Sequence, residues 1–204
     1  MPPVRFERDQ LPSTAWKNGG GRTREIVRLP PESGMDAFDW RASIADISAD
    51  GPFSTFAGVD RVIVLLNGDG VRLRSIDGTI DHQLDQPLVP FAFSGDDAIV
   101  ASLIGGASTD FNIMTRRAVA RADVRVVRAD DVVPTCSSGM LFAAQGTWAA
   151  RAVGGPSDKP VQPFAYSLHP NSGVWWEGEA LTWDLSSNVA DGALIAVRVT
   201  RHSG

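Results

Sequence analysis

The sequence predicts an all-β protein, a sandwich or barrel built from many short strands. Turn-forming residues are dense, with 20 glycines and 13 prolines in 204 residues. Short runs rich in Val, Ile, Phe, Trp and Ala separate the turn clusters, and few windows have the spacing of an amphipathic helix. Short strands at regular spacing with turn signals between them are typical of β-sandwiches and β-barrels.

The predicted strands fall in two sets, one in each part of the chain. The first set comprises residues 24–29, 40–47, 61–67, 71–75, 80–84, 91–93, 99–104 and 110–116. The second set comprises residues 123–128, 139–144, 147–153, 164–168, 173–176, 180–184 and 193–200. The polar segments 30–36 and 154–163 are rich in Pro and Gly, so we expect them to be surface loops.

A weak internal repeat relates the two sets. The segment Arg-Val-Ile-Val-Leu-Leu-Asn-Gly-Asp-Gly-Val-Arg-Leu, from Arg61, resembles Gly-Met-Leu-Phe-Ala-Ala-Gln-Gly-Thr-Trp-Ala-Ala-Arg, from Gly139. Each combines an apolar strand, a tight turn that contains Gly and a return strand. We therefore expect two similar units packed as one globular body, residues 1–116 and 117–204, with the ligand site in the first.

Composition and charge exclude several function classes. Hydrophobic residues make up 43% and charged residues 21%, which is ordinary for a globular protein, and the net charge of −5 disfavours nucleic acid and anionic membranes as partners. The N-terminus lacks the apolar core of a signal peptide, and no later run is long and apolar enough to span a bilayer. Cys136 is the only cysteine, so an internal disulfide is excluded and a cytoplasmic location is expected.

Five segments, in this order, resemble the HutD/Ves family of bicupin proteins. They cover about half of the chain, all within its first two thirds, and only the hairpin pattern matches beyond Arg117. The segments are Trp-Lys-Asn-Gly-Gly-Gly-Arg-Thr-Arg-Glu-Ile from Trp16, Phe-Asp-Trp-Arg-Ala-Ser-Ile-Ala-Asp-Ile from Phe38, Gly-Pro-Phe-Ser-Thr-Phe-Ala-Gly-Val-Asp-Arg from Gly51, Pro-Phe-Ala-Phe-Ser-Gly-Asp from Pro90, and Asp-Phe-Asn-Ile-Met-Thr-Arg-Arg from Asp110.

The resemblance implies a bicupin, with two RmlC-like jelly-roll cupin units in one chain and no cofactor or catalytic metal. The family is associated with histidine utilisation. The implied role is that of an accessory or regulatory factor, which senses or buffers a pathway intermediate such as urocanate or N-formylglutamate and does not catalyse a step.

Residues 54–68 keep the spacing of a metal-binding cupin motif and lose its chemistry. Such a motif places His, any residue, His, a short gap and Glu, and ends on a Gly after a further strand. Here Ser54 and Phe56 occupy the histidine positions, Arg61 replaces the glutamate, and Gly68 closes the pattern. A guanidinium repels a divalent cation and suits a small carboxylate, so we expect a metal-free site.

Arg61 and Arg41 are the residues expected to bind the carboxylate. Strand alternation puts Arg41 on the same face as Ser43, and Arg61 begins an apolar strand, where a buried arginine needs an anionic partner. One alternative stays open, in which Arg61 pairs with Glu25 or Asp110 inside the protein and binds no ligand.

The remaining candidates are polar groups that orient the ligand and rings that wall the site. Asn18 precedes three glycines, which form either an anion-binding nest or a flexible turn. Each Phe has core packing as its simpler interpretation, except Phe56, which occupies a metal-ligand position of the cupin motif. The polar candidates are Asn18, Thr23, Glu25, Ser43, Ser54 and Asn112, and the walls are Trp16, Phe53, Phe56 and Phe93.

Two other functions remain open. A metal-independent cupin enzyme, an isomerase or hydrolase of a small acid, would use Asp110, Glu25 or Asp60 as a general base. A scaffold would use the tryptophans as a protein interface. No other catalytic residue is expected, and the expected partner is a small carboxylate, with a homodimer left open.

Overall fold

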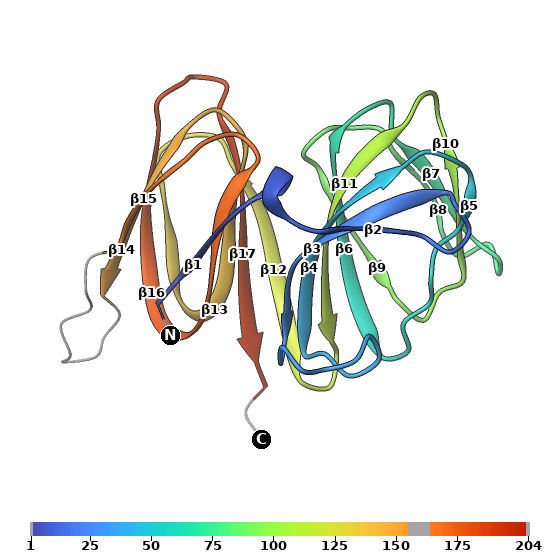
Figure 1. Cartoon of the computed structure of the whole chain (residues 1–204), viewed down its shortest axis with the longest axis horizontal. Coiled ribbons are helices and arrows are strands. Elements are labelled where there is room, and N and C mark those ends of the chain that lie inside the picture. The colour runs from blue at the N-terminus through green and yellow to red at the C-terminus, as the bar shows by residue number, and fades with distance from the viewer. Residues whose placement is uncertain (1, 155–163, 203–204) are drawn as a thin grey trace. The chain divides into compact units, whose positions relative to one another are not determined.

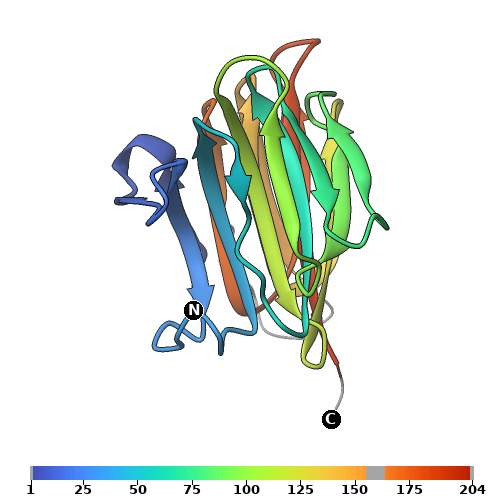
Figure 2. The ribbon, with the colours of Figure 1, turned by 90° about the vertical axis from the view of Figure 1, so that its right-hand side faces the viewer.

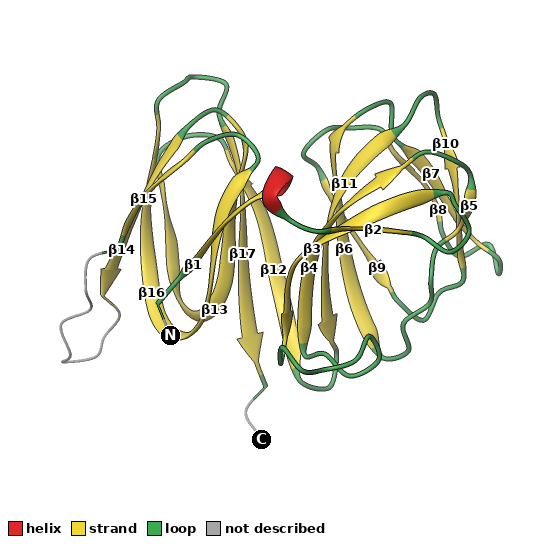
Figure 3. Cartoon of the chain, viewed as in Figure 1, coloured by secondary structure: helices red, strands yellow, loops and turns green. Residues whose placement is uncertain are grey.

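The computed structural model describes residues 2–154 and 164–202, and it confirms the all-β prediction (Figure 3). Among the described residues the only helix is the short 3-10 turn η1 (Arg8–Gln10). None of the helical segments in this part of the chain has the length and apolar character of a transmembrane span.

The strands form two compact units (Figure 1). The N-terminal unit is Leu11–Arg121 with the residues from Arg201 onward, and the C-terminal unit is Ala122–Thr200 with the residues up to Gln10. The first ten residues belong to the C-terminal unit because β1 (Val4–Glu7) pairs antiparallel with β16 (Ser172–Ser187). The division expected from the sequence, at residues 116 and 117, did not include this pairing.

The N-terminal unit contains a six-stranded and a four-stranded sheet. The six-stranded sheet has the order β2 (Ser13–Ala15), β3 (Gly21–Leu29), β4 (Trp40–Ile47), β11 (Ser108–Arg116), β6 (Val59–Asn67), β9 (Pro90–Ser94). The four-stranded sheet has the order β5 (Gly51–Pro52), β10 (Ile99–Leu103), β7 (Val71–Ser75), β8 (Asp81–Leu84). Figure 2 shows the antiparallel strands of the larger sheet side by side, from β3 in blue across β4 and β11.

Apolar side chains from both sheets of this unit pack into one core. Ile63 and Leu65 of β6 meet Leu73 of β7 and Ile99 of β10, and all four are buried. Trp16 and Phe53 are partly buried against this core. The candidate site lies on the same face of β6 as this core.

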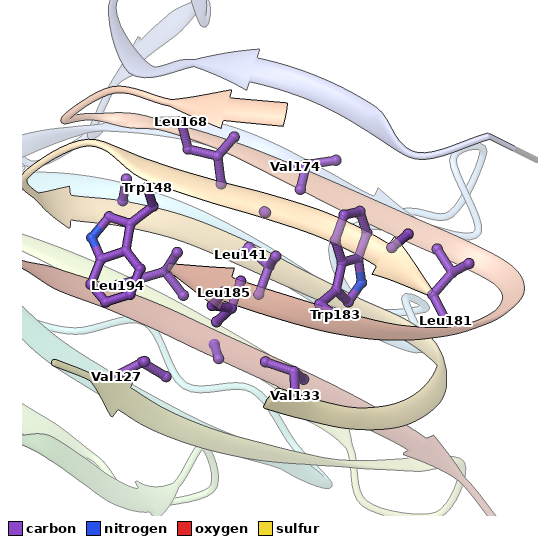
Figure 4. Packing of buried hydrophobic residues seen from close by; sticks show 14 of the residues in the cluster. Val127, Val133, Leu141, Trp148, Leu168, Val174, Leu181, Trp183, Leu185 and Leu194 are labelled. Carbon is purple, nitrogen blue, oxygen red and sulfur yellow. The ribbon is translucent and has the colours of Figure 1, made fainter. Parts of the chain in front are cut away.

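The C-terminal unit forms one sheet. Its order is β12 (Ala120–Val127), β17 (Ala193–Arg201), β13 (Asp131–Gln145), β16, β14 (Trp148–Gly154), β15 (Ala165–Leu168), with β1 paired to β16. The core is apolar and includes the fully buried rings of Trp148, Trp176 and Trp183. Figure 4 shows Trp148 and Trp183 among the leucines and valines of this core.

Every strand predicted from the sequence overlaps an observed strand. The structure corrects one detail, because segments 173–176 and 180–184 belong to the single strand β16. Glu177, Gly178 and Glu179 resemble a turn in sequence, yet they lie within this strand, which pairs with β13 on both sides of them across a register shift. The short strands β1, β2 and β5 were missed, and the predicted loop 154–163 lies outside the described residues beyond Gly154.

Candidate functional site

Arg61 is the central residue of the candidate site. It lies near the start of β6, 6% exposed, between Phe93 of β9 and Met114 of β11 in the strand register. The guanidinium carbon Cζ is 4.8 Å from the ring centre of Phe93, 5.4 Å from that of Phe53 and 5.8 Å from that of Phe56. Three aromatic rings therefore hold a cation by cation–π attraction.

The polar contacts of Arg61 are long and incomplete. One terminal nitrogen, Nη1, donates to the carbonyl oxygen of Ser54 at 3.4 Å, and the other, Nη2, donates to Oδ1 of Asn112 at 3.3 Å. The buried Nε–H has no hydrogen-bond partner. Among the described residues, no carboxylate forms an ion pair with Arg61, since Glu25 pairs with other arginines and Asp110 has no hydrogen-bond partner. The alternative of an internal ion pair is excluded.

The charge of Arg61 is held in an unfavourable environment. Burial and, to a smaller extent, the positive charge of Arg41 lower the pKa of its guanidinium to about 9. Removal of a cation from water is costly unless a counter-charge and hydrogen bonds replace the lost hydration. An anion bound at this position would supply both.

Arg41, in contrast, has a carboxylate partner. Its Nε donates to Oε2 of Glu25 at 2.7 Å, and the other oxygen of Glu25 lies 3.5 Å from Nε of Arg28. Nη1 of Arg41 contacts the sulfur of Met114 at 3.9 Å. Met114 is the register partner of both Arg41 and Arg61, so the two arginines flank it across three strands. The pair of Arg41 with Glu25 is close to neutral, and Arg61 carries the uncompensated charge.

A row of polar side chains lies beside the arginines on the same face of the sheet. In register order across β3, β4 and β11, the row is Glu25, Ser43 and Asn112, and it ends at the apolar Ile63 of β6. Ser43 is 2% and Asn112 is 5% exposed. Asn112 accepts a hydrogen bond from Arg61, and Glu25 accepts one from Arg41, so both guanidinium groups lean toward this row.

Asp110 lies in the next row on this face, beside Ala45 of β4 and Leu65 of β6. Its side chain is fully buried, and neither carboxyl oxygen has a hydrogen-bond partner. Burial raises the pKa of Asp110 to about 7. An isolated buried carboxyl group of this kind is common at functional sites.

Trp16 and Thr23 belong to the same region, where the edge strand β2 pairs with β3. The indole Nε1–H of Trp16 donates to Oγ1 of Thr23 at 2.8 Å, and the indole meets the ring of Phe53 edge to face with centres 6.2 Å apart. Gly21 permits this position, since a Cβ there would lie 3.1 Å from the Trp16 ring and 2.4 Å from the carbonyl oxygen of Asp46. Thr23 is in register with Ala45, in the row of Asp110.

Two of the predicted polar residues do not turn their side chains toward Arg61. The side-chain oxygen of Asn18 accepts from the backbone N–H of Gly20 at 3.1 Å and so closes the exposed glycine turn. Ser54 is exposed and contributes its carbonyl oxygen to Arg61. Met114 was missed by sequence reasoning, because its place between the arginines follows only from the pairing of three strands.

The residues in the metal positions of the cupin motif do not fit a metal ion. Ser54 is exposed, Phe56 offers a ring, and Arg61 carries a positive charge. Within residues 2–154 and 164–202, no three His, Cys, Asp or Glu residues gather in a group suited to a metal ion. Donor chemistry of this kind favours an anion over a cation.

The tryptophans do not form an exposed patch. Trp40, Trp148, Trp176 and Trp183 are fully buried, Trp16 is half-buried against the core, and Trp175 is partly buried. The scaffold hypothesis therefore lacks the surface that it requires on the described residues.

Asp60, one of the alternative general bases, pairs on the surface with Arg117 at 2.8 Å.

Comparisons with known proteins show the family of this chain. Residues 8–195 match the HutD family model. Protein Ves from Escherichia fergusonii is 44% identical over 146 residues, which are 70% of this chain and 73% of that protein. The family resemblance seen in the sequence is thereby confirmed.

Solved structures extend the match to nearly the whole chain. A conserved protein of unknown function from Pseudomonas aeruginosa PAO1 is 33% identical with a TM-score of 0.85, covering 98% of this chain and 99% of that one. HutD from Pseudomonas fluorescens SBW25 is 28% identical with a TM-score of 0.82, covering 98% and 100%. An oxalate decarboxylase from Lactobacillus farciminis, 6% identical over 97% of this chain and 88% of that one, shares the fold at a TM-score of 0.66. The bicupin prediction is confirmed, and the chain belongs to the HutD family.

Proposed function

We propose that this chain is a metal-free cupin that binds a small carboxylate intermediate of histidine degradation, urocanate or N-formylglutamate, as an accessory or regulatory factor of histidine utilisation. The observation that carries the proposal is the buried guanidinium of Arg61, which has three aromatic neighbours, an unsatisfied Nε–H and no carboxylate partner among the described residues. A ligand carboxylate would accept from Nε and a terminal nitrogen in the forked geometry that arginine favours.

Charge and shape both support a flat or short acid. Phe53, Phe56 and Phe93 lie around the guanidinium, and rings of this kind favour a planar partner by stacking. Asn112 would orient the carboxylate through its amide. The link to histidine degradation rests on membership of the HutD family. The cytoplasmic location and a homodimer stay predictions.

The test is calorimetric titration of the purified chain with urocanate, N-formylglutamate and formate, which the solved HutD structure names as its condition. Loss of a desolvated arginine–carboxylate contact costs about 2–5 kcal/mol. We therefore expect Arg61→Met to weaken binding of the natural acid by at least about thirtyfold. Arg117→Met removes a half-exposed surface arginine and serves as the matched control with unchanged affinity.

Melting temperatures distinguish loss of the site from loss of the fold. Arg61→Met replaces an uncompensated cation by an apolar chain of similar length among three rings, so we expect the unliganded variant to be at least as stable as the parent. The proposal is wrong if Arg61→Met folds normally and binds every acid as the parent does.

An enzyme acting on the same acid is the second candidate, because Asp110 keeps a carboxyl group with a pKa near neutrality on the face that bears Arg61. Groups of this kind serve as general acids or bases. Turnover of urocanate or N-formylglutamate, followed by proton NMR and lost in Asp110→Asn, would establish the enzyme. Binding without turnover would support the accessory role.

A further inference from the structure

Asp110 is the one buried carboxyl group on the interior face of the described N-terminal unit whose oxygens both lack a hydrogen-bond partner. Its neighbours in register are Ala45 and Leu65, which offer no hydrogen bond from their side chains. A buried carboxyl group left unpaired lowers stability, and sites where such a group persists are commonly functional.

The strand register fixes how far Asp110 lies from the arginine end of the site. Nη2 of Arg61 reaches Oδ1 of Asn112, so the guanidinium lies at the level of Asn112 along β11. Asp110 is two residues away on the same strand and the same face, a step of about 7 Å. This length matches a small acid with a second polar group several bonds from its carboxylate.

We propose that Asp110 is a specificity-determining contact of this site, which hydrogen-bonds the second polar group of the ligand while Arg61 holds its carboxylate. The inference rests on the proposed function and names the class of ligand: an acid with an N–H or hydroxyl group at its far end. Trp16, fixed to Thr23 in the row of Asp110, would cover that end.

The chemistry of Asp110 suits this contact. Burial raises its pKa to about 7, so at neutral pH about half of the carboxyl groups are in the acid form. The acid form both donates and accepts a hydrogen bond and does not repel a ligand that is itself an anion. The other charged groups on this face are Glu25, Arg28, Arg41 and Arg61, and the residues of β7 and β10 in the core are apolar.

The experiment uses two acids of the same shape that differ at the far end. Urocanate carries an imidazole N–H, and trans-cinnamate carries a phenyl ring in its place. Titration of the intact chain is expected to give at least tenfold tighter binding of urocanate, and Asp110→Leu is expected to abolish this preference while it leaves the affinity for cinnamate within about twofold. Asp110→Asn, which keeps a donor and an acceptor, should retain most of it.

The matched control is Asp60→Asn, which removes a carboxylate from the surface side of β6 and should leave the preference unchanged. A preference that survives in Asp110→Leu, or its absence from the parent while both acids bind through Arg61, overturns the inference alone. Failure of urocanate, N-formylglutamate and cinnamate alike to bind in an Arg61-dependent manner overturns the proposed function on which it rests.

Discussion

The two units of this chain use the same strand pairing around different interiors. In the N-terminal unit β6 pairs with β11, and in the C-terminal unit β13 pairs with β17. The register shifts directly beyond the pair of Leu65 with Asp110 in the first unit, and directly beyond the pair of Ala143 with Leu194 in the second. The register pairs Arg61 with Met114, Ile63 with Asn112 and Leu65 with Asp110 in one unit, and Gly139 with Arg198, Leu141 with Ala196 and Ala143 with Leu194 in the other.

This correspondence matches the polar residues of the site to apolar ones. Gly139 occupies the position equivalent to Arg61, Ala196 the position equivalent to Asn112, and Leu194 the position equivalent to Asp110. Trp176, the register partner of Gly139 on β16, stands for Phe93. The Trp176 ring fills the interior of the C-terminal unit at the position where the N-terminal unit holds the Arg61 guanidinium.

The comparison of these equivalent positions shows which residues the fold requires. A cupin unit of this chain forms with Gly, Ala and Leu at these three positions, so Arg61, Asn112 and Asp110 are not required for the strand arrangement. Their burial in the first unit lowers stability, as the displaced pKa values of Arg61 and Asp110 indicate. A ligand is the simplest reason for keeping them.

The largest expected effect comes from a substitution that disrupts the apolar interior of the C-terminal unit. A Cβ at position 139 would lie 2.4 Å from the carbonyl oxygen of Val197 and 2.7 Å from the Trp176 ring. We expect Gly139→Ala to lower the free energy of unfolding by more than about 4 kcal/mol, since backbone and a packed ring must both move. Gly34→Ala is the control, because nothing lies within 4 Å of its added Cβ. Equal melting temperatures of the two variants in a calorimeter would contradict the correspondence.

The next prediction exchanges the residues at two equivalent positions, Asp110 and Leu194. The pKa of Asp110 is raised from 3.8 to about 7, so between these values the unfolded chain releases a proton that the folded chain keeps. Stability due to Asp110 therefore falls as pH rises from about 4 to 7, by up to about 4 kcal/mol, and is constant above.

Asp110→Leu should remove this loss, and Leu194→Asp should introduce a similar one in the other unit. The measurement is the melting temperature of the parent and both variants at pH 4 and pH 8. The parent and Asp110→Leu should differ more at pH 8 than at pH 4. A constant difference would mean that Asp110 is hydrated or paired in solution.

Local sequence patterns predicted most of the fold. Strands such as Trp40–Ile47 and Val71–Ser75 were predicted to the residue, because each begins directly after an Asp or a Gly and contains β-branched or aromatic residues. What failed depends on partners distant in sequence. The short β1 is a strand because β16 pairs with it, and β16 itself is one strand because β13 pairs with it on both sides of residues 178–180 and β14 pairs with its second part.

The candidate site was predictable to a similar depth. The cupin spacing pointed to Arg61, and the structure brings Arg41, Asn112 and the three phenylalanines around it. Asn18 and Ser54 lie in loops, where the sequence does not determine the direction of a side chain. The isolation of Asp110 required the register of β4, β11 and β6, which no single segment contains.

The smallest expected effect is the difference in stability between substitutions of two tryptophans in the C-terminal interior. Trp176 and Trp183 are both fully buried with ring centres 5.3 Å apart, but only Trp176 has a hydrogen-bond partner, the carbonyl oxygen of Cys136 at 3.1 Å. Both changes to Phe remove similar volume, and Trp176→Phe also leaves that carbonyl unpaired. It should destabilise the chain by about 1 kcal/mol more than Trp183→Phe in urea unfolding. If the C-terminal interior is only a packed core, both variants bind acids as the parent does, and altered acid affinity in either would contradict this interpretation.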